Sequence, residues 1–185
     1  MLTAKKNYGF TLTEMLISIV IILLVLLMIT SIFIISQRVM RQANYKAELI
    51  QNSRVALDLM SREIRQAKFI TTTLPETSTN APQEIMFEDG HDVSEIKYTK
   101  YILIDNKVYR QIFVYYFDTN PEIFVRYNDI DAFGSPNSLL IDEKLIGEYF
   151  KDLIFYGVDN INVDMTMEKA GTEIFIKTLI NPRNI

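Results

Sequence analysis

Glu14 has the most unusual surroundings of any ionisable residue, because this carboxylate lies at the edge of a long apolar segment. No charged residue occurs from Met15 to Gln37, where Leu, Ile, Val and Met dominate. A helix rises about 1.5 Å per residue, so this segment is long enough to cross a bilayer core of roughly 30 Å. A carboxylate at the edge of such a span is costly and usually has a partner. Glu14 therefore either pairs with a positive group or extends to interfacial water.

Other residues could bind a metal ion, but their patterns are weak. His91 is the only histidine, which excludes a site with several histidine ligands, and we expect it in a solvated loop rather than as a ligand. Asp129, Asp131 and nearby Asn128 carry oxygens of the kind that Ca²⁺ prefers. Their spacing does not match a full calcium loop, so we expect a solvated acidic loop. The sequence predicts no metal site.

The sequence also gives no sign of enzymatic chemistry. It contains no cysteine, and no nucleophile motif, P-loop or dinucleotide-binding motif appears. Phe113, Tyr115, Tyr116 and Phe117 could form a stacking platform for nucleic acid, although at strand spacing one face of this group is expected in the core. We predict a protein that is not an enzyme, with no cofactor, no catalytic residue and no small-molecule substrate.

The composition describes one globular domain attached to a membrane helix. The chain has 185 residues and a formal net charge of −4. An acidic protein is a poor general binder of nucleic acid, because such binding depends on neutralising phosphates. Nucleic acid is therefore not an expected partner, although a basic groove in the structure would favour it.

One long helix is predicted from Phe10 to about Ala67, since neither Pro nor Gly occurs between Phe10 and Phe69. Its second half is amphipathic, and we expect its apolar stripe to pack against a sheet. The alternative is two helices joined near Ser36 and Gln37. The members of the expected stripe are Leu49, Ile50, Ala56, Leu57, Met60, Ile64 and Ala67.

Antiparallel strands are predicted after the helix. A polar loop over 75–83 leads into strands at 84–88, 95–104, 107–117, 123–127, 153–156, 161–168 and 172–180. Asp105-Asn106 and Ala170-Gly171 are expected to form tight turns. Residues 128–138 are expected as a loop, and 139–146 is ambiguous between a strand and a turn. Alternation over 161–168 predicts a half-buried strand.

The segment Lys5-Lys6-Asn7-Tyr8-Gly9-Phe10-Thr11-Leu12-Thr13-Glu14-Met15-Leu16 resembles the leader and cleavage site of type IV prepilins and of the pseudopilins of type II secretion and competence systems. The resemblance implies that a prepilin peptidase of the inner membrane cuts after Gly9 and methylates the new N-terminal residue, Phe10. It also implies that Glu14 pairs with the Phe10 amine of a neighbouring subunit. An ordinary secretory signal fits poorly, because the apolar run is too long and no small-x-small cleavage site follows it.

The resemblance implies an α+β, pilin-like fold, in which a long N-terminal helix, membrane-spanning in its first half, packs on an antiparallel sheet. The expected regions are a leader at 1–9, a transmembrane and assembly segment at 10–36, and an exported domain at 37–185. Lys5 and Lys6 on one side are matched by Arg38, Arg41 and Lys46 on the other, so charge alone does not orient the span. The resemblance implies a single-pass inner-membrane protein with a cytoplasmic N-terminus.

The expected function is that of a structural subunit, which assembles with other pilin or pseudopilin subunits into a fibre. The segment 54–67 resembles the outer helix of J-type minor pseudopilins and related minor pilins, which also tend to end in Arg-Asn, as at Arg183-Asn184. Many major pilins close a loop with a disulfide, so the absence of cysteine favours a minor subunit. The alternatives are a competence-pilus subunit that contributes to DNA uptake and a membrane-anchored adhesin or sensor domain outside any fibre.

Overall fold

The computed structural model of the protein describes residues 9–90 and 95–183. His91 and Asn184 lie outside these residues, as does the leader before Gly9, so the expectations for them are not addressed by the fold. The described chain divides into two compact units, residues 1–44 and 45–185.

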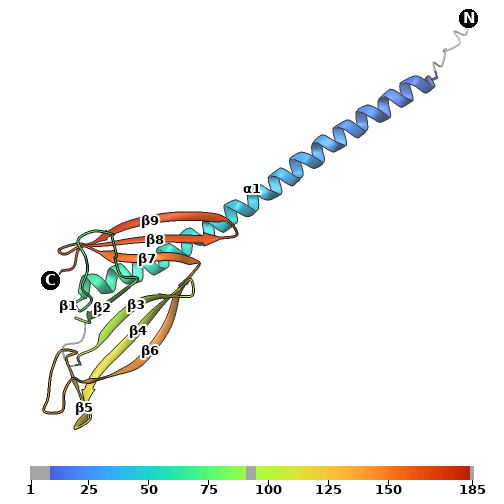
Figure 1. The fold of residues 1–185 in the computed structure, drawn as a ribbon. Helices are drawn as coiled ribbons and strands as arrows, with labels where there is room; N and C mark the ends of the chain where they lie inside the picture. Colours follow the sequence, from blue (N-terminus) through green and yellow to red (C-terminus); the bar gives the residue numbers. More distant parts are fainter. Residues whose placement is uncertain (1–8, 91–94, 184–185) are drawn as a thin grey trace, which may run out of the picture. The chain divides into compact units, whose positions relative to one another are not determined.

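Helix α1 runs without interruption from Leu12 to Gln66, a length of 55 residues (Figure 1). The prediction of one long helix is confirmed, and the alternative of two helices joined near Ser36 is wrong. Every side chain from residue 12 to residue 44 is exposed. This part of the helix therefore buries none of its apolar surface against the described chain.

The second half of α1 buries one stripe. The buried residues of the helix are Leu49, Ser53, Ala56, Met60 and Ile64. One member of the predicted stripe is misplaced, since Ile50 is 41% exposed, whereas Leu57 is half-buried and packs against the core. Ser53 is buried in the stripe instead, and it satisfies its hydroxyl by donating to the Ile50 carbonyl at 2.8 Å.

The helix ends where the chain turns into the first sheet. Lys68 N–H donates to the Glu88 carbonyl at 3.0 Å, which brings the chain at Glu88 against the end of α1. Gly90 is required by this approach, because a Cβ there would lie 2.2 Å from the Gln66 carbonyl oxygen. A larger residue at position 90 would push the two segments apart.

The first sheet has six antiparallel strands. They are β1 (Phe69–Ile70), β2 (Glu84–Glu88), β3 (Tyr98–Ile104), β4 (Lys107–Phe117), β5 (Asn120–Val125) and β6 (Asn137–Glu148). The order is β1-β2-β3-β4-β5, and β6 pairs with β4. Strand β5 begins and ends earlier than predicted, because Arg126 N–H donates to Asp129 Oδ2 at 2.8 Å and starts a turn.

The ambiguous segment 139–146 belongs to β6, a strand of 12 residues. Its register against β4 shifts twice, between Val108 and Tyr109 and between Ile112 and Phe113. Each shift inserts a residue and interrupts the alternation of inward and outward side chains. The sequence pattern therefore lacked the period of two that identifies a strand.

The second sheet has three antiparallel strands, β7 (Phe150–Tyr156), β8 (Ile161–Lys169) and β9 (Thr172–Ile180). The predicted alternation in β8 is confirmed, since Ile161, Val163, Met165 and Met167 are all buried. Both predicted two-residue turns are present, and their residues adopt positive φ: Asp105 and Asn106 between β3 and β4, Ala170 and Gly171 between β8 and β9.

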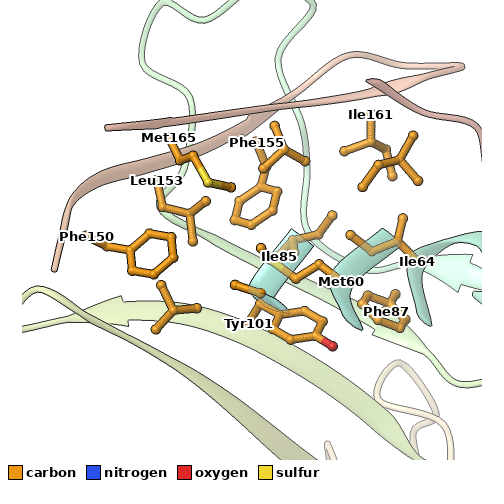
Figure 2. Packing of buried hydrophobic residues seen from close by; sticks show 14 of the residues in the cluster. Met60, Ile64, Ile85, Phe87, Tyr101, Phe150, Leu153, Phe155, Ile161 and Met165 are labelled. Carbon is orange, nitrogen blue, oxygen red and sulfur yellow. The ribbon is translucent and has the colours of Figure 1, made fainter. Parts of the chain in front are cut away.

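One hydrophobic core joins the helix to both sheets (Figure 2). Met60 and Ile64 of α1 lie beside Ile85 and Phe87 of β2. From the second sheet, Phe155 and its neighbours close the core. The α+β, pilin-like architecture is thus confirmed, with two antiparallel sheets on the helix.

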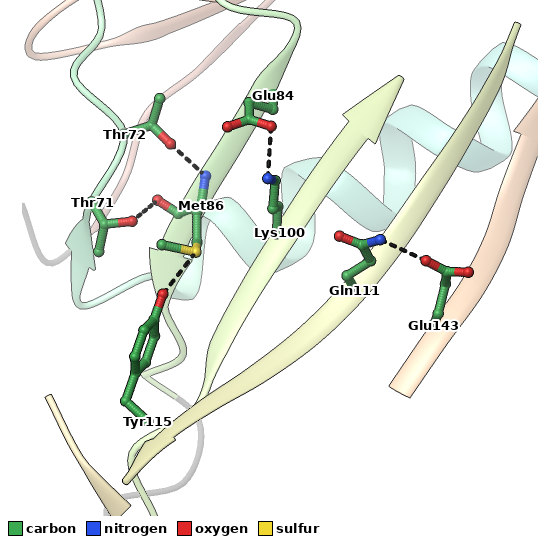
Figure 3. A network of polar contacts seen from close by, with 8 residues as sticks. All are labelled: Thr71, Thr72, Glu84, Met86, Lys100, Gln111, Tyr115 and Glu143. Atoms are coloured by element: carbon green, nitrogen blue, oxygen red, sulfur yellow. Dashed lines mark hydrogen bonds and ion pairs between the residues drawn. The ribbon is translucent and has the colours of Figure 1, made fainter. Parts of the chain in front are cut away.

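Side-chain hydrogen bonds attach the loop after β1 to the first sheet (Figure 3). Thr71 Oγ1 donates to the Met86 carbonyl at 2.9 Å, and Met86 N–H donates to Thr72 Oγ1 at 2.8 Å. The two threonine hydroxyls therefore form the hydrogen bonds with the Met86 backbone that a neighbouring strand would otherwise form.

Two ion pairs attach α1 to the sheets. The carboxylate of Glu63 accepts from Arg110 Nε at 3.0 and 2.9 Å, and the buried Tyr101 hydroxyl donates to the same carboxylate. Burial raises the pKa of Tyr101, and the charge of Glu63 raises it further, so the hydroxyl remains a donor. Nearer the N-terminal end of the second unit, which comprises residues 45–185, Glu48 pairs with Lys169 of β8.

Replacing Glu63 by Ala is expected to lower the free energy of unfolding by about 2 kcal/mol, because hydrogen bonds to charged groups contribute about 1.5–3 kcal/mol and Arg110 would lose its carboxylate partner. Urea titration of the full chain in detergent, followed by tyrosine fluorescence, measures this. Asp58→Ala is the control on the same helix, where an exposed carboxylate is removed and a change within about 0.5 kcal/mol is expected. Equal losses in both variants would contradict the assignment.

Candidate processing and assembly site

Gly9 and Phe10 lie just before the first residue of α1, and both are exposed. The Phe10 side chain is 82% exposed. A Cβ added at Gly9 would meet no atom within 4 Å. Packing within the chain therefore does not explain a glycine at position 9, and the bond between Gly9 and Phe10 is open to an enzyme.

Glu14 forms a capping box with Thr11 at the start of the helix. Thr11 N–H and Thr11 Oγ1 each donate to Glu14 Oε2 at 2.9 Å, and Glu14 N–H donates back to Thr11 Oγ1 at 3.3 Å. This reciprocal arrangement satisfies two backbone N–H groups at the helix start, of which the Glu14 N–H has no partner within the helix. A carboxylate in the first turn also interacts favourably with the helix dipole.

The capping box uses only one oxygen of the carboxylate. Within the part of the chain that the structure describes, Glu14 Oε1 accepts no hydrogen bond and forms no ion pair. The two sequence hypotheses were a cationic partner or interfacial water, and neither included a local cap. The Thr-x-x-Glu pattern before an apolar run was the available signal.

Three hydroxyl groups inside the apolar segment are satisfied within the helix. Ser18, Thr30 and Ser31 each donate to the carbonyl four residues earlier at 2.8 Å. These three hydroxyls therefore keep a hydrogen-bond partner when water is removed, which suits a helix in lipid or among other helices. By length and composition, α1 is the one helix among the described residues that could cross a membrane.

Residues 4–30 match a family model described as the prokaryotic N-terminal methylation motif. This match supports the resemblance of the N-terminus to type IV prepilins and pseudopilins. The match includes Gly9, Phe10 and Glu14, and it indicates a processed structural subunit rather than an enzyme. The motif implies action by a prepilin peptidase and assembly with other pilin subunits, and together with the apolar helix it fits a membrane-anchored pilin. No curated protein matches the chain.

The other predicted sites are structural in this fold. Asp129 and Asp131 accept backbone N–H groups of their own loop. Among the described residues, no group of three or more potential metal ligands occurs. Tyr115 packs edge-on against Tyr98, with 5.2 Å between the ring centroids, and both lie near Tyr127. Burial raises the pKa of Tyr98 and of Tyr115.

Sequence reasoning missed a buried carboxylate on the outer side of the second sheet. Asp164 of β8 accepts from the Tyr156 hydroxyl at 3.2 Å and pairs with Lys177 at 3.3 Å. The hydrogen bond with Tyr156 raises the pKa of Lys177, burial opposes this, and Asp164 adds to the rise. Asp164 occupied a polar position of an alternating strand, so no sequence signal separated it from an exposed aspartate.

Sequence reasoning also missed a groove within residues 45–185, with a volume of about 670 Å³. It is bordered by α1, β9 and the residue Arg183. Arg54, Arg62 and Arg65 of α1 line it too. The three helical arginines lie outside the predicted apolar stripe. Their proximity to Arg183 depends on the return of the chain to the end of the helix, which the sequence does not reveal.

Replacing Thr11 by Val is expected to loosen the first turn of α1, because the hydroxyl of the capping box is lost while the side-chain shape is kept. Loss of a cap costs about 1 kcal/mol, which corresponds to about a fivefold faster hydrogen exchange at the amides of residues 13–15. Hydrogen exchange of the full chain in detergent measures this. Thr30→Val removes a hydroxyl in mid-helix, and it should leave exchange at residues 13–15 unchanged.

Proposed function

We propose that this protein is a structural subunit of a type IV pilus or of a type II secretion pseudopilus. A prepilin peptidase cuts between Gly9 and Phe10 and methylates the Phe10 amine. The observation that carries the proposal is the methylation motif over residues 4–30. The exposure of Gly9 and Phe10 ahead of α1 supports it, because a peptidase must reach an extended, uncovered bond.

Glu14 directs assembly in this proposal. Cleavage creates an ammonium at Phe10, and methylation preserves its positive charge. In a fibre, Glu14 Oε1, which has no partner among the described residues, receives the Phe10 ammonium of a neighbouring subunit while Oε2 stays in the cap. In a bundle of low dielectric constant, loss of either partner leaves an unpaired charge, so the pair fixes the axial register of the subunits.

The apolar surface of α1 indicates where this takes place. Its apolar side chains over 12–36 are uncovered by the described chain, so lipid covers them before assembly and neighbouring helices afterwards. We assign a leader to 1–9, the transmembrane and assembly segment to 10–36, and the exported domain to 37–185. The N-terminus is cytoplasmic before cleavage, on the face where the peptidase acts.

The finer assignment is a minor subunit, related to J-type pseudopilins. It is supported by the absence of cysteine and by the resemblance of residues 54–67 to the outer helix of that group.

A competence-pilus subunit that binds DNA is the second candidate, because the structure contains the arginine-lined groove that such a function would need. The groove lining includes Asp58 and no aromatic residue. A continuous phosphate backbone would meet that carboxylate, and bases would find no ring for stacking. The structural-subunit proposal is therefore preferred.

Processing is tested by mass spectrometry of the protein from its native host or from cells that co-express a prepilin peptidase. The expected N-terminus is Phe10 carrying one added methyl group. Gly9→Leu should block cleavage, since a bulky residue replaces the last leader residue, and Gly9→Ala should be partly tolerated. An intact Met1 or Leu2 in assembled material would refute processing and favour a membrane-anchored sensor or adhesin domain.

The role of Glu14 is tested by cross-linking processed subunits in the native membrane. Glu14→Gln removes the charge but keeps the Thr-x-x-Gln capping box, whereas Glu14→Ala removes both. Both variants should be cleaved normally, and both should lose about tenfold in cross-linked product, equivalent to about 1.4 kcal/mol. Equal yields of the same contacts in wild type and Glu14→Gln would return Glu14 to the alternative of an interfacial glutamate.

A further inference from the structure

The arginine groove is defined by Arg54, Arg62, Arg65 and Arg183, which surround a single carboxylate, Asp58. All five side chains are exposed. Within the described residues, none of the four guanidinium groups forms an ion pair. Four unpaired cations in one hollow of an acidic protein are unfavourable to each other, so the groove is suited to an anionic occupant.

The groove is held in shape by the backbone. Arg183 N–H donates to the Arg65 carbonyl at 3.1 Å, which fixes the chain after β9 against the last turn of α1. The planar guanidinium group forms paired hydrogen bonds with carboxylates. A segment with two carboxylates would therefore find several donors already in place.

The remaining lining indicates a polypeptide. Ile50, Leu57 and Ile176 border the groove between the arginines. Burying these side chains against an apolar side chain of the occupant is favourable. A phosphodiester backbone carries no such side chain. The occupant therefore combines carboxylates with at least one exposed apolar residue.

The chain contains a segment of this kind in the loop between β5 and β6, which we call the acidic loop and define as residues 128–134. Asp129 and Asp131 flank Ile130, which is 78% exposed, and Phe133 is 86% exposed. Neither aspartate forms an ion pair among the described residues. The loop thus exposes the carboxylate of Asp129 and leaves that of Asp131 half-buried, beside two large exposed apolar side chains.

The acidic loop is also ordered by its own hydrogen bonds. Asp131 N–H donates to the Gly134 carbonyl at 3.1 Å, and Asp131 Oδ1 accepts from the N–H groups of Phe133 and Gly134. A segment that is already folded loses less conformational entropy when it docks.

We propose that the arginine groove of one copy of this protein binds the acidic loop of a second copy. The groove belongs to α1 and β9, and the loop belongs to the first sheet, so the contact joins two different surfaces. Such a head-to-tail contact leaves a free groove on one copy and a free loop on the other, and it can repeat along a fibre. The inference rests on the proposed function and requires at least two successive copies.

Disulfide cross-linking tests the contact directly, because the chain contains no cysteine. Ser61→Cys lines the groove, and Ser135→Cys is exposed directly after the acidic loop. Full-length chains in the membrane that carry one substitution each should form a mixed dimer on mild oxidation. A chain with both substitutions should form a ladder of higher multimers. Absence of the mixed dimer overturns the proposal.

Charge variants distinguish docking from random collision. Asp129→Asn with Asp131→Asn keeps the oxygen acceptors of the loop but removes both charges, and Arg62→Gln with Arg65→Gln removes two charges from the groove. Each pair of substitutions should reduce the yield of the mixed dimer about tenfold, since it removes two of the charges on which the contact depends. Asp105→Asn with Asp159→Asn, and Arg38→Gln with Arg41→Gln, are matched controls that should leave the yield unchanged. Equal losses in the controls overturn the proposal.

The nucleic-acid alternative is tested with the same chains. A fluorescent 20-nucleotide single strand and the corresponding duplex are titrated into wild type and into Arg62→Gln with Arg65→Gln. If nucleic acid binds only when these arginines are present, and if its binding abolishes the mixed dimer, the groove binds nucleic acid and the assignment of the acidic loop as its occupant is overturned. The groove variants should leave cleavage after Gly9 and cross-linking through the N-terminal helices unchanged. The groove–loop contact can therefore be refuted without refuting the proposed function.

Discussion

The chain itself buries the surface of α1 only on the stripe that begins at Leu49, and over residues 12–44 every side chain is exposed. Removing the apolar surface of this part of α1 from water is the largest favourable contribution to free energy that is available to the protein outside its own core. The covering material must come from other molecules. The sheets stabilise only the later part of the helix, through the core around Met60 and Ile64 and the pairs of Glu63 and Glu48.

The start of the helix shows how a single side chain can serve two environments. In the isolated chain, Glu14 and Thr11 satisfy backbone groups that would otherwise meet hydrocarbon or water without a partner. Only one carboxylate oxygen is used for this purpose. A helix in lipid therefore begins with its end already closed, and it still presents an acceptor to a positive group from outside.

The sequence allowed the long helix, both tight turns and the strands at 84–88, 107–117 and 172–180 to be predicted correctly, because each has a local signal. Strand β6 was ambiguous, since its bulges depend on the partner strand β4. The stripe of α1 was partly wrong at Ile50 and Ser53, because a buried serine can satisfy its hydroxyl within the helix. Glu14 was identified from its apolar surroundings, but the arginine groove needed residues 54–65 and 183 to be brought together by the fold.

Strand β6 lies at the edge of its sheet, since β4 is the only described strand that pairs with it. Leu139, Leu140 and Ile141 are each between 43% and 50% exposed, and a long edge with such residues is a template for uncontrolled strand addition. Two register shifts and the charged run Asp142-Glu143-Lys144 interrupt that edge. The backbone N–H and carbonyl groups of an added strand would not align with those of β6 along its whole length. Its side chains would also lie beside the charged residues. These interruptions therefore disfavour amyloid-like strand addition between copies at this edge.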